Sequence, residues 1–248
     1  MSTNPSRHPI RALWCVIRSR STAFERMMEQ RGDHRCHHEP FGDVWYNGEE
    51  PHCPPNRVQN PTPGLTIASR LAEVLADADE SPVFFKDMSE YVLHLADDDF
   101  LGRFEHSFLI RDPARTVPSI FDKWPDFALS ETGFAEQHEL FDRVTALRGS
   151  PPPVIDAEDL MADTPGLVAA WCRAVDIDFR PEALEWEAEV RDYSWYDGGA
   201  WHDNLRTSTG LVAPDTDYLP VEADQRMVDA YEACLPHYEA MAVHRLRA

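Results

Sequence analysis

Long apolar runs are missing from this sequence of 248 residues, and no stretch approaches the roughly 18 residues that would span a membrane. Hydrophobic residues still make up 43% of the chain, which is enough to bury a substantial core. The first segment, MSTNPSRHPIRAL, contains no apolar run of the secretory type. We therefore expect a single globular domain over residues 1–248, with no membrane partner and a cytoplasmic location.

Cysteine is scarce and follows no pattern, with five residues at positions 15, 36, 53, 172 and 234. An odd, irregularly spaced set without a secretory segment indicates reduced thiols rather than disulfides. Cys36 and Cys53 lie near histidines 37, 38 and 52, so zinc is one alternative reading. Neither group has the C-x2–4-C or H-x3–5-H spacing of structural zinc sites, and we expect no metal.

Lysine is almost absent, occurring only as Lys86 and Lys123, and the formal net charge is −21. An acidic chain of this kind disfavours nucleic acids and anionic membranes as partners. The charge is uneven, however, because the first segment carries arginines 7, 11, 18, 20, 26, 31 and 35. A locally basic patch in an acidic protein suits a small multivalent anion better than a polymer of phosphates.

Glycine is also missing between Ile10 and Gln30, and the GxxxxGK[ST] motif of ATP-binding P-loops does not occur. Instead, an apolar run at 13–17 leads into Arg-Ser-Arg-Ser-Thr at 18–22, and a helical pattern follows. A strand, a turn rich in hydroxyl and guanidinium groups, and a helix form the local arrangement of an anion-binding loop. The helix offers free N–H groups and its positive dipole end. An ordinary turn capped by Ser21 is the alternative.

Further apolar runs predict strands at 83–87, 107–110 and 154–156, separated by helical patterns at 65–79, 88–96, 114–124, 133–148 and 157–176, the last broken near Pro165. Alternating strands and helices predict an α/β fold with a central parallel sheet flanked by helices. The irregular, proline-rich segment 32–63 predicts a lid or insertion at about 40–63. Helical spacing predicts a C-terminal helix at about 222–246, kinked at Pro236.

Ligands bind beyond the carboxyl ends of the strands in such sheets, where Arg18, Lys86 and Arg111 fall. The segment FLIRDPARTVPSIF places Arg111 at a strand end and Ser119 eight residues later in a helix. Together with the 18–22 loop, this segment resembles the sulfotransferases that use 3′-phosphoadenosine-5′-phosphosulfate (PAPS). The resemblance implies a P-loop-NTPase-like sulfotransferase architecture.

Residue by residue, the resemblance implies a binding site for PAPS and its product, adenosine 3′,5′-bisphosphate (PAP). Arg18 takes the place of the usual loop lysine, and Arg20 stands where many members have glycine. The loop hydroxyls are Ser19, Ser21 and Thr22, and Arg111 with Ser119 matches the pair that holds the 3′-phosphate. More loosely, the late loop that closes over the cofactor corresponds to Arg206, Ser208, Thr209 and Gly210.

Sulfonyl transfer needs cations and N–H groups for the developing negative charge, and a base for the acceptor proton, but no metal. Arg18 and Lys86 are the candidate charge stabilisers, although Lys86 could instead form a strand-end salt bridge. Some bacterial relatives place a catalytic glutamate where Glu39 lies, so Glu39 is the candidate base and His38 its rival. Glu39 could instead pair with an arginine, which would lower its pKa.

The expected activity is transfer of a sulfonyl group from PAPS to a hydroxyl, less readily an amine, of a small metabolite. Such a sulfate ester is a good leaving group and could activate the acceptor for elimination or cyclisation. An ATP-dependent P-loop kinase and a non-catalytic partner protein that keeps the fold are the alternatives. The terminal helix could pack on its own domain, in a homodimer or on a partner protein.

Overall fold

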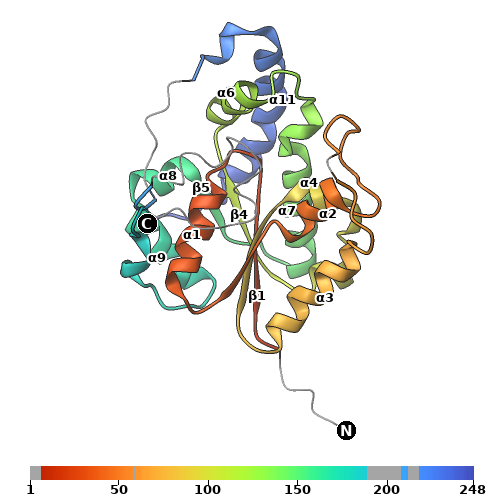
Figure 1. Cartoon of the computed structure of the whole chain (residues 1–248). Coiled ribbons are helices and arrows are strands. Elements are labelled where there is room, and N and C mark those ends of the chain that lie inside the picture. Colours follow the sequence, from red (N-terminus) through yellow and green to blue (C-terminus); the bar gives the residue numbers. More distant parts are fainter. Residues whose placement is uncertain (1–6, 59, 189–207, 212–217) are drawn as a thin grey trace.

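The computed structural model describes residues 7–58, 60–188, 208–211 and 218–248. Within them, five strands form one parallel sheet in the order β2-β3-β1-β4-β5 (Figure 1). The strands are β1 (Ile10–Cys15), β2 (Arg35–His38), β3 (Val83–Met88), β4 (Glu105–Ile110) and β5 (Val154–Asp156). The predicted α/β fold with a central parallel sheet is therefore confirmed.

Helices cover both faces of the sheet. Figure 1 shows α1, α8 and α9 on one side, and α2, α3, α4 and α7 on the other. The α-helices are α1 (Ser21–Arg31), α2 (Pro40–Asn47), α3 (Ile67–Ala78), α4 (Ser89–Val92), α5 (Asp98–Leu101), α6 (Pro113–Lys123), α7 (Phe134–Arg148), α8 (Ala157–Ala162), α9 (Thr164–Ala174) and α11 (Gln225–Ala242). Short 3-10 helices are η1 (Leu93–Leu95), η2 (Leu129–Thr132), η3 (Pro181–Leu184) and η6 (Val221–Ala223). None of the helices in the described residues is long and apolar enough to cross a membrane.

The central strands β1 and β3 are buried along their whole length, as expected for strands covered on both faces. Aromatic rings fill the space beside them, and Trp14 meets Phe85 edge to face at 5.4 Å between ring centroids. The first strand lies at 10–15 rather than at the predicted 13–17. Val16 and Ile17 therefore belong to the loop that follows β1.

The segment 32–63 is predicted to be irregular, but its first half contains β2 and α2. The prediction is therefore wrong for that half of the segment. The four residues of β2 are partly exposed at the sheet edge and show no apolar alternation, so the sequence carries no strand signal there. Pro40 fits the first turn of α2, where a missing N–H costs nothing. Phe41 is fully buried, so the beginning of the predicted lid belongs to the core.

Two predicted helices are divided in the structure. The pattern at 88–96 forms α4 and η1, and the pattern at 157–176 is broken at Asp163, near Pro165 as predicted. Asp163 caps α9, because its carboxylate accepts a hydrogen bond of 3.0 Å from the N–H of Gly166. Pro165 then occupies the first turn of α9, a favourable place for proline.

A buried histidine in β4 gives a prediction for the pH dependence of stability. Trp14 Nε1 donates to His106 Nδ1 at 2.8 Å, and His106 Nε2 lies 2.9 Å from the carbonyl oxygen of Leu101. Burial lowers the pKa of His106 from 6.5 to about 4. A lowered pKa stabilises the fold above the unfolded-state value, and this contribution is lost as the pH falls through about 4.

The contribution amounts to about 3 kcal/mol, because each pKa unit corresponds to about 1.4 kcal/mol. Urea unfolding of the wild type and of His106→Asn at pH 7 and pH 4 measures it. The drop in the free energy of unfolding between these two pH values should be about 3 kcal/mol smaller in the variant. Equal drops in the two proteins would mean that His106 does not titrate in this way.

Candidate active site

The carboxyl ends of β1, β2, β3 and β4 meet at one edge of the sheet, and most of the predicted site residues follow these ends. Register places Cys15 of β1 beside Met88 of β3 and Leu109 of β4. His38 of β2 lies beside Lys86 of β3. The loop at 16–20, the turn at Glu39 and the start of α6 are therefore neighbours.

The loop after β1 holds two arginines in a left-handed backbone conformation, Arg18 at φ 63° and Arg20 at φ 72°. This conformation costs a non-glycine residue about 1–2 kcal/mol and occurs mostly where surrounding structure enforces it. Arg20 is the N-cap of α1 and makes no side-chain cap, while Ser21 is the first helical residue. The alternative of a turn capped by Ser21 is therefore wrong. The first N–H groups of α1 have no partner within the helix and face the loop.

Arg18, Arg111 and Ser119 lie together although they come from distant parts of the chain. Arg18 Nε donates to Ser119 Oγ at 2.9 Å, and one Arg111 Nη donates to the carbonyl oxygen of Arg18 at 2.7 Å. Arg111 thereby holds the strained loop in place from β4. Its Nε also donates to Glu158 at 3.2 Å. The pKa of Arg20 falls to about 10, first because of burial and then because Arg111 is close.

Two polar side-chain atoms of the loop are buried without a hydrogen-bond partner in the described residues, namely Ser19 Oγ and Arg20 Nε. A buried, unpaired polar atom costs about 1–3 kcal/mol and calls for an explanation. A phosphate or sulfate group at the N-terminus of α1 would provide acceptors for both donors. The donor set of this loop therefore fits a phosphosulfate or phosphate ligand.

Lys86 is fully buried in β3 and forms an ion pair with Glu39. Burial by itself lowers the pKa of Lys86, but Glu39 and then Glu25 outweigh that effect and the pKa is raised. Glu39 continues β2, because its N–H donates to the carbonyl oxygen of Lys86 at 3.0 Å. Its backbone is left-handed at φ 41°, and α2 begins at the next residue. The predicted salt bridge of Lys86 thus involves the candidate base itself.

His38 links Glu39 to a carboxylate that is not among the predicted site residues. His38 Nδ1 lies 2.7 Å from Glu25 Oε2, and His38 Nε2 lies 3.7 Å from Glu39 Oε1. Glu25 is buried in α1, on the helical face of Ser21 four residues earlier. The four-residue spacing from Ser21 is the only feature of the sequence that indicates on which face of α1 Glu25 lies. Glu25, His38, Glu39 and Lys86 form a continuous chain of charged and hydrogen-bonding groups.

The family of the chain follows from a match to the Sulfotransferase domain over residues 10–245. The chain belongs to the sulfotransferase family. It is also 29% identical over 163 residues to the branched-chain-amino-acid aminotransferase-like protein 2 of Arabidopsis thaliana. That match covers 65% of this chain and only 28% of the length of the plant protein.

Two solved structures are similar to this chain at low sequence identity. The sulfotransferase domain of the Synechococcus PCC 7002 olefin synthase has a TM-score of 0.49 at 14% identity, and 94% of this chain and 97% of that domain are covered. The sulfotransferase domain from the curacin biosynthetic pathway has a TM-score of 0.40 at 14% identity, with 73% and 78% covered. The family assignment rests on the match over residues 10–245.

Three of the four looser predictions, Ser208, Thr209 and Gly210, lie beside Glu185 and Trp186. The backbone and side chain of Ser208 accept hydrogen bonds from Trp186 Nε1, the carbonyl of Thr209 accepts from Trp186 N, and Gly210 pairs with Glu185. Arg206 lies outside the described residues. Tyr218 is a neighbour that the sequence does not indicate. Its hydroxyl lies 3.5 Å from Arg18, and its pKa is lowered because Ser119 and Arg18 outweigh the effect of burial.

The zinc alternative finds no support in the part of the chain that the structure describes. Within it, no group of three or more histidine, cysteine, aspartate and glutamate side chains is arranged to hold a metal ion. His37 instead pairs with Asp77 at 2.9 Å. His52 packs on His94, with 4.6 Å between ring centroids.

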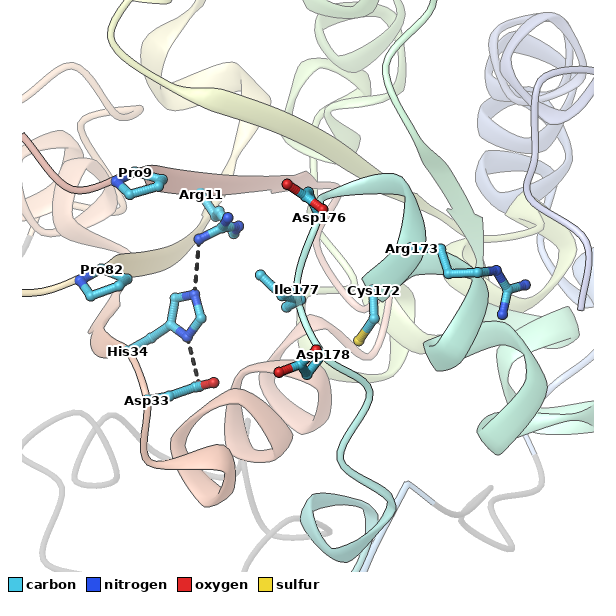
Figure 2. A pocket seen from close by; sticks show the side chains of 10 residues that line it. All are labelled: Pro9, Arg11, Asp33, His34, Pro82, Cys172, Arg173, Asp176, Ile177 and Asp178. Atoms are coloured by element: carbon cyan, nitrogen blue, oxygen red, sulfur yellow. Dashed lines mark hydrogen bonds and ion pairs between the residues drawn. The ribbon is translucent and has the colours of Figure 1, made fainter.

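A separate cavity of about 560 Å³ lies at the opposite edge of the sheet, near the amino ends of β1, β2 and β3 (Figure 2). His34 stands in its wall between Arg11, at 3.1 Å, and Asp33, at 2.7 Å. None of the predicted site residues lines this cavity. The cavity and the predicted site residues therefore lie at opposite edges of the sheet.

Proposed function

We propose that this sulfotransferase moves a sulfonyl group from PAPS to a hydroxyl of a small-molecule acceptor. The observation that carries the proposal is the pairing of two sites at one sheet edge. The Arg18–Arg111–Ser119 cluster adjoins the strained loop, and the Lys86–Glu39 pair lies at the end of the neighbouring strand. The first site suits an anionic nucleotide, and the second suits proton transfer and charge stabilisation.

The guanidinium groups of Arg18 and Arg111 would hold the 3′-phosphate of the nucleotide together with Ser119. Guanidinium groups match the planar, multidentate geometry of a phosphate better than an ammonium group does. In this arrangement Arg18 acts on the 3′-phosphate side, because its Nε already points at Ser119. The role of charge stabiliser at the sulfonyl group then belongs to Lys86.

Ser19 and the first N–H groups of α1 would hold the 5′-phosphosulfate. PAPS supplies an activated sulfonyl group bonded to a phosphate that leaves with the bonding electron pair. Hydrogen-bond donors fixed before the reaction stabilise charge on that phosphate without reorganising. The left-handed backbone at Arg18 and Arg20 would orient the N–H groups of the loop toward the phosphosulfate. This role gives a reason for the strained conformation at both residues.

Glu39 would accept the hydroxyl proton of the acceptor while the acceptor oxygen bonds to sulfur and the sulfur–phosphate oxygen bond breaks. Protonation of Glu39 removes the negative partner of Lys86. The ammonium group of Lys86 is then free to turn its charge toward the sulfonyl and bridging oxygens. His38, held by Glu25, keeps the Glu39 carboxylate in position. The ion pair thus couples proton removal to charge stabilisation.

An aminotransferase activity is not part of this proposal, although the Arabidopsis relative carries that word in its name. Pyridoxal phosphate enzymes bind their cofactor through a lysine Schiff base, which needs an uncharged amine. Lys86 is buried in an ion pair with Glu39, and Lys123 lies 3.1 Å from Asp122. The chain spans only 28% of that relative.

Thermal unfolding with PAP, compared with ATP and magnesium, tests the proposed function. PAP at one hundred times its Kd should add about 2.7 kcal/mol to the free energy of unfolding, with no requirement for magnesium. Stabilisation by ATP with magnesium but not by PAP would favour a P-loop kinase and refute the donor assignment. Stabilisation by PAP without any PAPS turnover on a broad panel of alcohols would favour the non-catalytic alternative.

A further inference from the structure

Glu90 is a carboxylate near the proposed base that no step of the reaction uses. It lies in α4, four residues after Lys86, where the chain leaves the carboxyl end of β3. A Cβ atom at Gly133 would come within 2.9 Å of Glu90 Oε2 and 3.8 Å of Val16 Cγ1. Gly133 has a left-handed backbone at φ 72°, and its missing side chain leaves room for the carboxylate. The Glu90 carboxylate therefore lies against the start of α7, where Val16 of the loop after β1 also approaches.

The Oε2 atom of Glu90 is buried and has no hydrogen-bond partner among the described residues. No ion pair to Glu90 occurs among the described residues: Lys86 pairs with Glu39, and Arg57 pairs with Glu131 at 2.8 Å. A buried carboxylate without a partner is costly, and a bound ligand is one way to supply the missing donor.

The surroundings of Glu90 are crowded with other carboxylates. Burial raises the pKa of Glu90 well above its usual range, and Glu136, Glu131, Glu39 and Asp87 raise it further. A neutral hydroxyl could donate one hydrogen bond there, but it would not relieve the repulsion between these groups. A positive charge would satisfy Oε2 and offset the negative field at the same time.

Aromatic side chains of α2 and α4 pack together beside Glu39. The hydroxyl groups of Tyr91 and Tyr46 lie 3.2 Å apart, and the rings of Tyr91 and Trp45 are 5.4 Å apart. A Cβ atom at Gly42 would touch both the Tyr91 ring, at 2.8 Å, and Glu39 Cβ, at 3.1 Å. The aromatic wall therefore adjoins Glu39, and ring faces attract cations.

We propose that Glu90 binds a protonated amine of the acceptor, so that the preferred substrates are amino alcohols rather than neutral alcohols. This inference rests on the proposed function, because it places the acceptor hydroxyl at Glu39 and the ammonium group at Glu90. The two carboxylates then have separate roles: Glu39 removes a proton, and Glu90 selects the charge of the substrate.

A matched pair of primary alcohols tests the inference. 4-(Aminomethyl)benzyl alcohol carries an ammonium group at neutral pH, and 4-ethylbenzyl alcohol is its neutral counterpart of the same shape. With saturating PAPS, the ratio of kcat/KM for the amine to kcat/KM for the neutral alcohol should exceed one in the wild type. Glu90→Gln keeps the shape of the side chain, and it should lower the ratio by roughly tenfold or more.

Glu139→Gln is the matched control, because it removes one negative charge from the exposed face of α7 and should leave the ratio unchanged. Binding is measured independently of turnover, as thermal stabilisation of the PAP-loaded protein by each alcohol. A wild type that does not prefer the amine, including one stabilised by neither alcohol, overturns the inference. The same holds if Glu90→Gln keeps the wild-type preference. Failure of PAP to bind would instead refute the proposed function, so the two failures are distinguishable.

Discussion

Replacing Lys86 with methionine is expected to lower kcat for sulfonyl transfer by about 10²–10³-fold, the usual effect of removing one preorganised charge or donor from a transition state. Methionine keeps the apolar stem of the buried side chain and removes only the ammonium group. Glu39 keeps some contact with solvent and lies 3.7 Å from His38, so the loss of Lys86 should not prevent folding. Initial rates of PAP release from PAPS, with the best acceptor from a panel of alcohols, measure the effect.

Lys123→Met is the natural control, because Lys123 is the only other lysine and is paired with Asp122 at the end of α6. Lys123→Met removes the same charge by the same substitution, away from the loop and from Glu39. It should leave kcat within about twofold of the wild type, whereas removal of a preorganised group should cause a much larger loss. Urea unfolding of both variants separates a loss of catalysis from a loss of structure. A Lys86→Met protein that is folded and retains wild-type kcat would exclude Lys86 as the charge stabiliser.

Glu39→Gln and His38→Gln should lower kcat by different amounts, and the larger loss identifies the base. If Glu39 takes the proton, Glu39→Gln should lower kcat by about 10²–10⁴-fold, the usual contribution of a general base. His38→Gln should cost less, because His38 reaches Glu39 only at 3.7 Å and acts through its position. The variants are compared by pH–rate profiles as well as by kcat.

Glu50→Gln, an exposed substitution three residues beyond α2, is the control for the loss of one carboxylate. It should leave the profile unchanged. A larger loss in His38→Gln than in Glu39→Gln, together with loss of the low-pH limb in that variant alone, would make His38 the base. Glu39 would then serve only as the partner of Lys86.

The sheet and the strand ends are predictable because they depend on local patterns. The apolar runs of β3, β4 and β5 are fully or largely buried, so their composition alone indicates strands in a parallel sheet. Polar residues directly after such runs must fall at one edge of the sheet. For this reason the order of residues along the chain is enough to place Arg18 and Arg111 near one another.

Other parts of the site depend on tertiary contacts that leave no periodic signal. β2 is an edge strand of polar residues that is held in place by pairing with β3. Glu25 is a charged residue of α1, and nothing in the sequence predicts that His38 of β2 lies against it. Helical spacing turns Arg26 away from the core, yet it is buried beneath the ring of Trp186, with its guanidinium carbon 5.6 Å from the ring centroid.

The Arg18–Ser119 contact illustrates what the sequence leaves open. Both residues are predicted site residues, but the place of Arg18 in the loop suggests a role at the sulfonyl group. Its side-chain direction depends on the left-handed backbone at Arg18 and on Arg111, which holds the Arg18 carbonyl. No spacing rule encodes such a turn when glycine is absent.

Calorimetric titration with PAP and with AMP tests the nucleotide site most directly, because the two ligands differ only in the 3′-phosphate. Two charge-assisted contacts from Arg18 and Arg111 should make PAP bind about 10²-fold or more tightly than AMP. Arg111→Gln should remove most of that difference, and the loss of AMP affinity should be the smaller of the two losses, because Arg111 also supports the loop. Equal affinities for PAP and AMP in the wild type would contradict the assignment of Arg18, Arg111 and Ser119 to the 3′-phosphate.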